Sequence, residues 1–131
     1  MEELAPGLSA ELTHTVTDAD TASKWGSGLV AVFSTPALVG FMESAAVAAL
    51  AGHLPPGQTT VGGRIDVRHL AATPVGMHVH VRAELTALEG RKLFFKIQAW
   101  DEVDLIGEAN HERFVVDEAK FLGRAQAKVK G

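Results

Sequence analysis

Residues 35–52, TPALVGFMESAAVAALAG, decide the fold. Thr35 and Pro36 predict the start of a helix, because threonine is a good N-cap and proline fits the first turn, where a backbone N–H has no partner. Gly52, with the HLPPG that follows it, predicts the end of that helix. Apolar side chains lie almost all the way round the helix, which predicts that it is buried on most sides.

Strand-like runs flank this helix in the sequence. Residues 9–17 alternate as a first strand, and a loop rich in Asp, Ser and Gly follows to about residue 28. Four more runs come after the helix, at residues 59–71, 77–88, 91–100 and 105–116. Glu89 and Gly90 predict a hairpin turn, and residues 117–131 are expected to be helical or frayed. This order predicts an α+β fold in which an antiparallel sheet curves around one central helix.

Composition limits the classes of protein. The chain has 131 residues, 47% of them hydrophobic and 21% charged, which suits one domain over residues 1–131. The net charge of −4 argues against nucleic acid and anionic membrane as partners. The absence of cysteine excludes disulfides, zinc–thiolate sites and thiol nucleophiles. The longest apolar stretch, residues 36–51, is too short to span a bilayer, and the acidic N-terminus is unlike a secretory signal. We expect a cytoplasmic protein.

Glu43 is the most informative polar residue of the helix. Its neighbours three and four positions away include no cation; they are Val39, Gly40, Ala46 and Val47. A carboxylate without such a partner either faces solvent or is buried for a functional reason, because burying an unpaired charge is costly. An exposed helix residue is the plain interpretation, and a general base is the functional one.

His69 is a second candidate. In the run GRIDVRHL its position has the same parity as Ile65 and Val67, so His69 points with the apolar residues at the end of a strand. A lone histidine on an apolar face is more often a hydrogen-bonded core residue than a catalyst, although histidine is the commonest general acid or base. Thr35 is a third candidate: capping nearly explains it, yet a hydroxyl at a helix N-terminus is also well placed beside a bound carbonyl.

Other residues carry weaker signals. Gly62 and Gly63 either let backbone N–H groups approach a substrate or mark a bulge. Phe33 and Met42, like Trp25 and Phe41, are either core residues or walls of a pocket. The run His111-Glu112-Arg113 matches no known motif by its spacing.

Two sets of charged residues allow binding hypotheses. Lys120, Arg124 and Lys128 recur every four residues, so a helical tail would carry one basic stripe, which either binds a phosphate or is a solvated face. His78 and His80 lie on the polar face of a strand without a carboxylate cluster, so we expect no metal site.

Together these motifs resemble a known family. VFSTPALVGFMESAAVAAL, RIDVRHLAATPVGMHVHVRAEL, LEGRKLFF and GEANHERFVV are similar to the fluoroacetyl-CoA thioesterase-like branch of the hot-dog thioesterases, from about residue 30 to residue 129. The resemblance implies a five-stranded antiparallel sheet around one helix. It implies Thr35, Glu43 and His69 as the catalytic set, with Gly62 at the substrate site. It also implies a homodimer or a larger assembly with active sites near the subunit interface, acyl-CoA as substrate, and no further cofactor.

The chain departs from the family in its lid. The fluoroacetyl-CoA enzyme carries lid phenylalanines just upstream of its threonine, whereas this chain reads WGSGLVAVFST, with Gly26 and Leu29 at the aligned positions. We therefore expect hydrolysis of another short or medium acyl-CoA, with the basic stripe as candidate contacts for the CoA phosphates. Two alternatives remain: a non-catalytic acyl-CoA or acyl-carrier binding module, and a hot-dog enoyl-CoA hydratase or dehydratase. Asp66 and His69 resemble the residue pair of the dehydratases, but their parity puts them on opposite faces.

Overall fold

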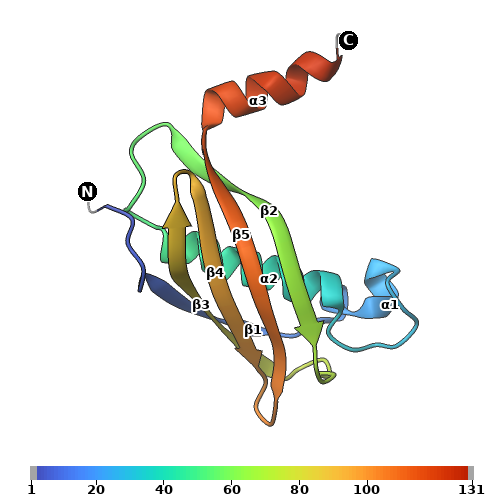
Figure 1. Cartoon of the computed structure of the whole chain (residues 1–131). Coiled ribbons are helices and arrows are strands. Elements are labelled where there is room, and N and C mark those ends of the chain that lie inside the picture. The colour runs from blue at the N-terminus through green and yellow to red at the C-terminus, as the bar shows by residue number, and fades with distance from the viewer. Residues whose placement is uncertain (1–2, 130–131) are drawn as a thin grey trace.

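One five-stranded sheet and a long helix make up the body of the protein (Figure 1). The computed structural model describes residues 3–129. The sheet has the order β1-β3-β4-β5-β2 and every pairing is antiparallel. The strands are β1 (Ser9–Thr15), β2 (Gln58–His69), β3 (His78–Glu89), β4 (Lys92–Trp100) and β5 (Leu105–Asp117), and the long helix is α2 (Thr35–Ala49). The predicted α+β arrangement is therefore confirmed, with element ends shifted by at most three residues.

Helix α2 lies across one face of the sheet and forms its core with β3, β4 and β5 (Figure 1). Its fully buried side chains include Leu38 and Met42, with three alanines in the next turns. The period of two predicted for residues 77–88 is confirmed, because Val79, Val81, Ala83 and Leu85 have no exposed surface. Gly107 of β5 lets the helix approach closely, since a Cβ there would lie 2.9 Å from Leu38 Cδ2.

The start of α2 differs from the prediction by one residue. Ser34, not Thr35, is the N-cap, and its side chain accepts a hydrogen bond of 3.1 Å from the Ala37 N–H. Thr35 is the first residue of the helix, with Pro36 behind it in the first turn. The serine hydroxyl meets the free amide of the first turn, which leaves the hydroxyl of Thr35 available for another contact.

One side of α2 is not covered. The predicted burial on most sides is confirmed, and the side that stays open carries Gly40, Ser44 and Val47, with 51% of Val47 accessible. The sheet covers a single face of the helix, and its edge strand β2 pairs only with β5. An apolar stripe beside an unpaired strand edge therefore remains open in the single chain.

Two segments lie outside this body. The predicted loop before α2 contains a short 3₁₀ turn at Asp18–Asp20 and the one-turn helix α1 (Ala22–Trp25). The tail forms α3 (Glu118–Gln126) and a final 3₁₀ turn at Ala127–Val129, which confirms its helical prediction over the described residues. Helix α3 projects beyond the end of the sheet where β5 ends and β2 begins (Figure 1). Among residues 3–129, no helix is long and apolar enough to cross a membrane.

Candidate active site

The first residue of α2 meets the last residue of β2. The Oγ1 of Thr35 lies 2.8 Å from Nδ1 of His69, a hydrogen-bond distance. The predicted parity of β2 is confirmed, because His69 is half-buried on the same face as Ile65 and Val67. Two candidates that each had an ordinary structural explanation therefore form a hydroxyl–imidazole pair.

Burial tunes the imidazole of this pair. Desolvation holds the pKa of His69 below its ordinary value, because a partly buried ring disfavours the charged form. Its Nε2 is shielded from solvent and has no hydrogen-bond partner among the described residues. A neutral His69 with its proton on Nε2 leaves Nδ1 free to accept the proton of Thr35, which is the arrangement of an activated hydroxyl.

The N-terminus of α2 adds a donor beside the pair. Ser34 satisfies the Ala37 N–H, and Pro36 has none. The Thr35 N–H has no acceptor among the described residues and is the remaining amide of the first turn. A surface pocket of about 380 Å³ opens here, lined by the Thr35–His69 pair, Phe33, Val32 and residues 70–72 among others. An oxyanion in this pocket would meet a free N–H at the positive end of the helix dipole.

A second polar cluster surrounds Glu43, two helical turns further on. Arg113 of β5 directs Nη1 at Glu43 Oε2, 3.2 Å away, and at His111 Nε2, also 3.2 Å away. Thr60 fixes the same guanidinium through its hydroxyl, 3.0 Å from Nε, and through its carbonyl, 3.1 Å from Nη2. Arg113 is buried, whereas 41% of the Glu43 side chain is exposed. Glu43 is therefore a carboxylate with one side toward solvent, and its partner is a cation of strand β5 and not of its own helix.

The same cluster fixes the orientation of the His111 ring. Its Nδ1 lies 2.7 Å from the Arg64 carbonyl and donates to it, which leaves Nε2 to accept from Arg113. Burial is the main cause that lowers the pKa of His111, and the charge of Arg113 acts in the same direction. His111 is thus held neutral and supports the arginine that holds Glu43.

Gly62 is needed at this cluster. A Cβ on Gly62 would lie 2.6 Å from Glu43 Oε2, closer than the carboxylate permits, so the glycine makes room for Glu43 against the strand. The register of β2 against β5 shifts between Gly62 and Arg64, which confirms the bulge interpretation. Gly63 faces the other side of the sheet, where a Cβ would strike the ring of Phe114. Only Gly62 of the predicted pair lies at the Glu43 cluster.

The predicted catalytic set is therefore divided within one chain. Thr35 and His69 are in contact, but no hydrogen bond joins Glu43 to either of them among the residues described. Eight residues separate Thr35 from Glu43 on α2, which is about 12 Å along the helix axis. The chain therefore presents two separate polar clusters along helix α2.

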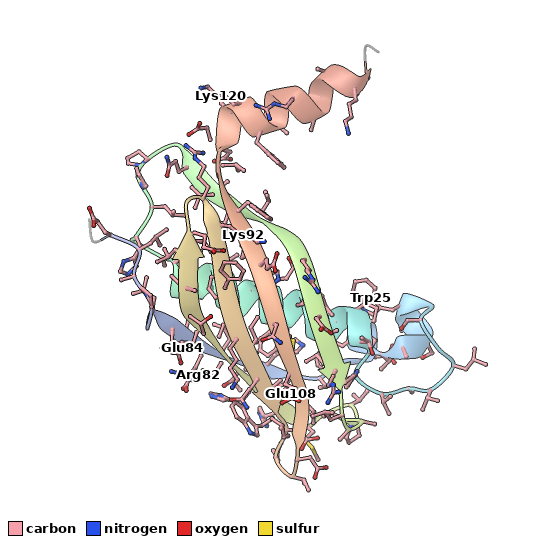
Figure 2. All side chains as sticks on the ribbon, in the orientation of Figure 1. Trp25, Arg82, Glu84, Lys92, Glu108 and Lys120 are labelled. Carbon is pink, nitrogen blue, oxygen red and sulfur yellow. The ribbon has the colours of Figure 1, made fainter. Side chains whose placement is uncertain are left out.

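The remaining candidates are distributed around the molecule. Phe33 is buried and forms a wall of the pocket beside Thr35, whereas Met42 has no exposed surface and is a core residue. Lys120 and Arg124 lie on α3, and Lys128 on the turn after it, away from the end of β2 where His69 lies. Figure 2 shows Lys120 and Trp25 at well-separated positions. Asp66 opens toward a groove on the outer face of the sheet, opposite His69, which removes the geometric basis of a dehydratase pair.

Two residues of the Glu43 cluster are not predicted from the sequence. His111 and Arg113 match no known motif. They nevertheless have the same strand parity as Gly107 and Ala109, which face the helix. An arginine in a core-facing series needs a buried partner, and Glu43 has no helical one. The core-facing position of Arg113 on β5, together with a helix carboxylate that lacks a helical partner, could have predicted the Glu43–Arg113 pair.

Hydrogen bonds of Thr73 and Leu70 hold the two segments that carry the Thr35–His69 pair. The Thr73 side chain is fully buried, and its hydroxyl donates to Asp101 Oδ2 over 2.8 Å. The Thr73 carbonyl accepts the Phe33 N–H at 2.8 Å, two residues before Thr35. The Leu70 N–H, one residue after His69, donates to the Ile106 carbonyl at 2.7 Å. The turn at 101–104 thus holds the segment before Thr35 through Thr73, and β5 holds the segment after His69.

Comparison with known structures identifies the class. The fold superposes on a hot-dog-like protein from Thermanaerovibrio acidaminovorans with a TM-score of 0.89 and 26% identity, over 98% of this chain and 95% of that one. It superposes on a thioesterase superfamily member from Thermus thermophilus with a TM-score of 0.91 and 28% identity, over 99% and 96% of the two chains. The protein has the hot-dog fold of the thioesterases.

Sequence comparison narrows this to one family. The family of fluoroacetyl-CoA-specific thioesterases matches residues 16–119. The fluoroacetyl-CoA thioesterase of Streptantibioticus cattleyicolor is 46% identical over 97 residues, 74% of this chain and 70% of that protein. A solved structure of the fluoroacetyl-CoA thioesterase FlK superposes with a TM-score of 0.92 and 36% identity, over 97% and 98% of the chains. The chain belongs to this family, and the predicted class of thioester hydrolase is confirmed.

Proposed function

We propose that the protein hydrolyses a short or medium acyl-CoA to the free acid and CoA, with Thr35, Glu43 and His69 as its catalytic residues. The observation that carries this proposal is the 2.8 Å contact between the Thr35 hydroxyl and the His69 imidazole at the free N-terminus of α2. A solved complex of a FlK variant with fluoroacetate and CoA, 38% identical, supports the substrate class.

The pair supplies a base and an oxyanion donor. The thioester carbonyl lies against the Thr35 N–H, where the helix N-terminus stabilises the negative charge that develops on oxygen. His69 takes a proton from the attacking hydroxyl, either Thr35 itself or a water, and returns it to the sulfur as the C–S bond breaks. If Thr35 attacks, water then hydrolyses the acyl ester and regenerates the hydroxyl. Mass spectrometry of enzyme quenched during a single turnover distinguishes the two routes, because an acyl-Thr35 intermediate adds the mass of the acyl group to the chain and direct attack by water does not.

Glu43 joins this chemistry through a second subunit. Edge strands can pair with a second copy of themselves, and β2 is the edge strand that carries Gly62 and His69. Antiparallel pairing of two β2 strands, centred between those residues, sets Gly62 of one subunit opposite the partner's His69. Each complete site then contains Thr35 and His69 from one chain and Glu43 with Arg113 from the other. Glu43 acts there as general base or as nucleophile.

The open surfaces favour this homodimer. The uncovered stripe of α2, with Val47 half exposed, lies on the helix face that the sheet does not cover. The outer face of the sheet is instead charged and internally paired, as in Arg82–Glu84 and Lys92–Glu112 (Figure 2). A partner that buries apolar surface therefore fits the β2 edge and not the outer face. Analytical ultracentrifugation tests the dimer. A molecular mass of one chain at every protein concentration would contradict it.

The acyl group is the open part of the substrate. Leu29 is 95% exposed and Gly26 takes a left-handed conformation, so residues 26–30 place no aromatic ring over the pocket. This segment gives no basis for selecting fluoroacetyl over another small acyl group. In this proposal CoA is part of the substrate and the enzyme uses no further cofactor. The reaction takes place in the cytoplasm, on a protein of one domain.

A thioesterase screen tests the proposal. Acyl-CoAs of graded chain length and polarity are supplied to the purified protein, and released thiol is measured. We expect turnover to peak at a short or medium chain. Saturable CoA binding without thiol release for any acyl group would replace the proposal with a binding module.

A further inference from the structure

Helix α3 contacts little of its own chain. Every residue from Glu118 to Val129 is exposed, including 44% of Phe121 and 53% of Leu122. Its backbone is joined to the body where the Glu118 N–H donates to the Gly57 carbonyl. A helix of nine residues is marginally stable alone in water, because nucleation is costly and tertiary packing normally supplies its stability. The projecting helix therefore leaves apolar surface uncovered in the single chain.

The base of this helix carries a cationic hollow. Lys120 and Arg124 lie one turn apart on α3 and line a hollow of about 130 Å³ with Arg91 from the β3–β4 turn. Asp117 is the single carboxylate of its lining. Lys120, Arg124 and Lys128 make no ion pair with the described residues, so their charges are available to an anionic ligand.

Within one chain this hollow and the Thr35–His69 pair lie at opposite ends of the sheet. It sits where β2 begins, whereas Thr35 and His69 lie where β2 ends (Figure 1). Antiparallel pairing of two β2 edges reverses this relation, because the start of one strand then lies beside the end of the other. Helix α3 of each subunit comes to the end of the dimer that holds the partner's Thr35–His69 pair.

We propose that α3 of each subunit binds the nucleotide phosphates of the acyl-CoA that reacts at the partner's Thr35–His69 pair. This inference rests on the proposed thioesterase function and its dimer, and adds which chain holds which part of the substrate. Phosphates of CoA are polyanionic, and Lys120 and Arg124 supply charged donors to them. Phe121 and Leu122 are exposed apolar side chains, and in this dimer they would face the partner's Leu29 and Val30, which are exposed as well. The partner copy thus contributes residues without which the site is incomplete.

Paired substrates test the phosphate contact. The double variant Lys120→Glu/Arg124→Glu is assayed with an acyl-CoA and with the pantetheine thioester of the same acyl group, which lacks the nucleotide. We expect the ratio of kcat/KM for the CoA ester to that for the pantetheine ester to fall by about tenfold or more. The control Arg82→Glu/Lys96→Glu makes the same change in net charge on the outer face of the sheet. An unchanged ratio overturns the inference, whereas no hydrolysis of either ester by the native protein refutes the proposed function instead.

Hybrid dimers test which chain supplies the helix. Differently tagged His69→Ala and Lys120→Glu/Arg124→Glu chains are co-expressed, and the doubly tagged dimer is purified. Its single competent His69 belongs to the charge-reversed chain, while the intact α3 belongs to the other. The proposal predicts the native KM for acyl-CoA at half the native number of sites. A KM that stays as high as in the charge-reversed homodimer shows instead that α3 serves its own chain.

Discussion

The Thr35 hydroxyl and the His69 imidazole, 2.8 Å apart, join the first residue of the central helix to the last residue of the edge strand. Their positions are fixed by main-chain structure on both sides, since Ser34 caps the helix and the Leu70 N–H donates to Ile106 across the sheet. A side-chain pair so held is prepared for proton transfer before any substrate is bound.

Removing any one of Thr35, Glu43 and His69 should abolish most turnover. We expect His69→Ala and Glu43→Ala each to lower kcat by about two to four orders of magnitude, the range of general acid–base catalysis. Thr35→Ala should have a comparable effect, and Thr35→Ser should keep much of the activity because it retains the hydroxyl. Steady-state thiol release measures kcat, and circular dichroism verifies folding. Near-native turnover in folded His69→Ala and Glu43→Ala would remove both residues from the mechanism.

The pH dependence of the reaction follows from the burial of His69. Desolvation lowers the pKa of His69 beneath the ordinary histidine value of about 6.5, so the ring is neutral and can act as a base at neutral pH. The acid limb of the kcat/KM profile should therefore fall below pH 6.5, and Thr35→Ser should leave it there. An acid limb above pH 7 would assign the titration to another group.

The same shifts set the pH dependence of stability. His69 and His111 both have a folded-state pKa below the unfolded value. Between those values the unfolded chain binds more protons than the folded one, so stability is lost as the pH falls through about 6.5 and the loss levels off below the folded pKa. Urea denaturation at a series of pH values should show this slope, and it should be smaller in His111→Asn if His111 contributes.

Gly62 and Gly63 offer a matched pair of substitutions. Gly62→Ala places a Cβ 2.6 Å from Glu43 Oε2 and must displace that carboxylate, so we expect kcat to fall by at least about tenfold with a modest change in Tm. In Gly63→Ala the new Cβ would instead clash with the Phe114 ring on the outer face of the sheet, so the main effect should be on stability. Thiol release and thermal denaturation of both variants separate the two effects. Equal losses of activity would show that the strand, not Glu43, is what the alanine disturbs.

How far the sequence could predict this protein differs between the fold and the site. The helix and the period-two strands are local patterns, so the sequence predicts the elements at residues 35–52 and 77–88 to within three residues of their observed ends. The identity of the N-cap was missed, because Ser34 and Thr35 are both good caps and only the long-range contact with His69 separates them. The Glu43–Arg113 pair was missed for the same reason: its members are 70 positions apart in the sequence, and no local period connects a helix face to a strand. Local periodicity defines elements, whereas a site depends on which elements become neighbours.

Thr73 should act as a positioning residue for the Thr35–His69 pair. Burial works against ionisation of Asp101, but hydrogen bonds from the Asp104 and Val103 N–H groups and from Thr73 hold its pKa below the ordinary value. Thr73→Val keeps the shape, removes the hydroxyl and leaves that carboxylate without a buried donor, which should cost about 1–3 kcal/mol of stability. Because the Thr73 carbonyl also holds Phe33, kcat should fall severalfold, while Thr73→Ser, which restores the hydroxyl, should recover both quantities. Chemical denaturation and kcat are measured on each variant; a serine variant as impaired as the valine variant would show that the methyl group, and not the hydroxyl, anchors the turn.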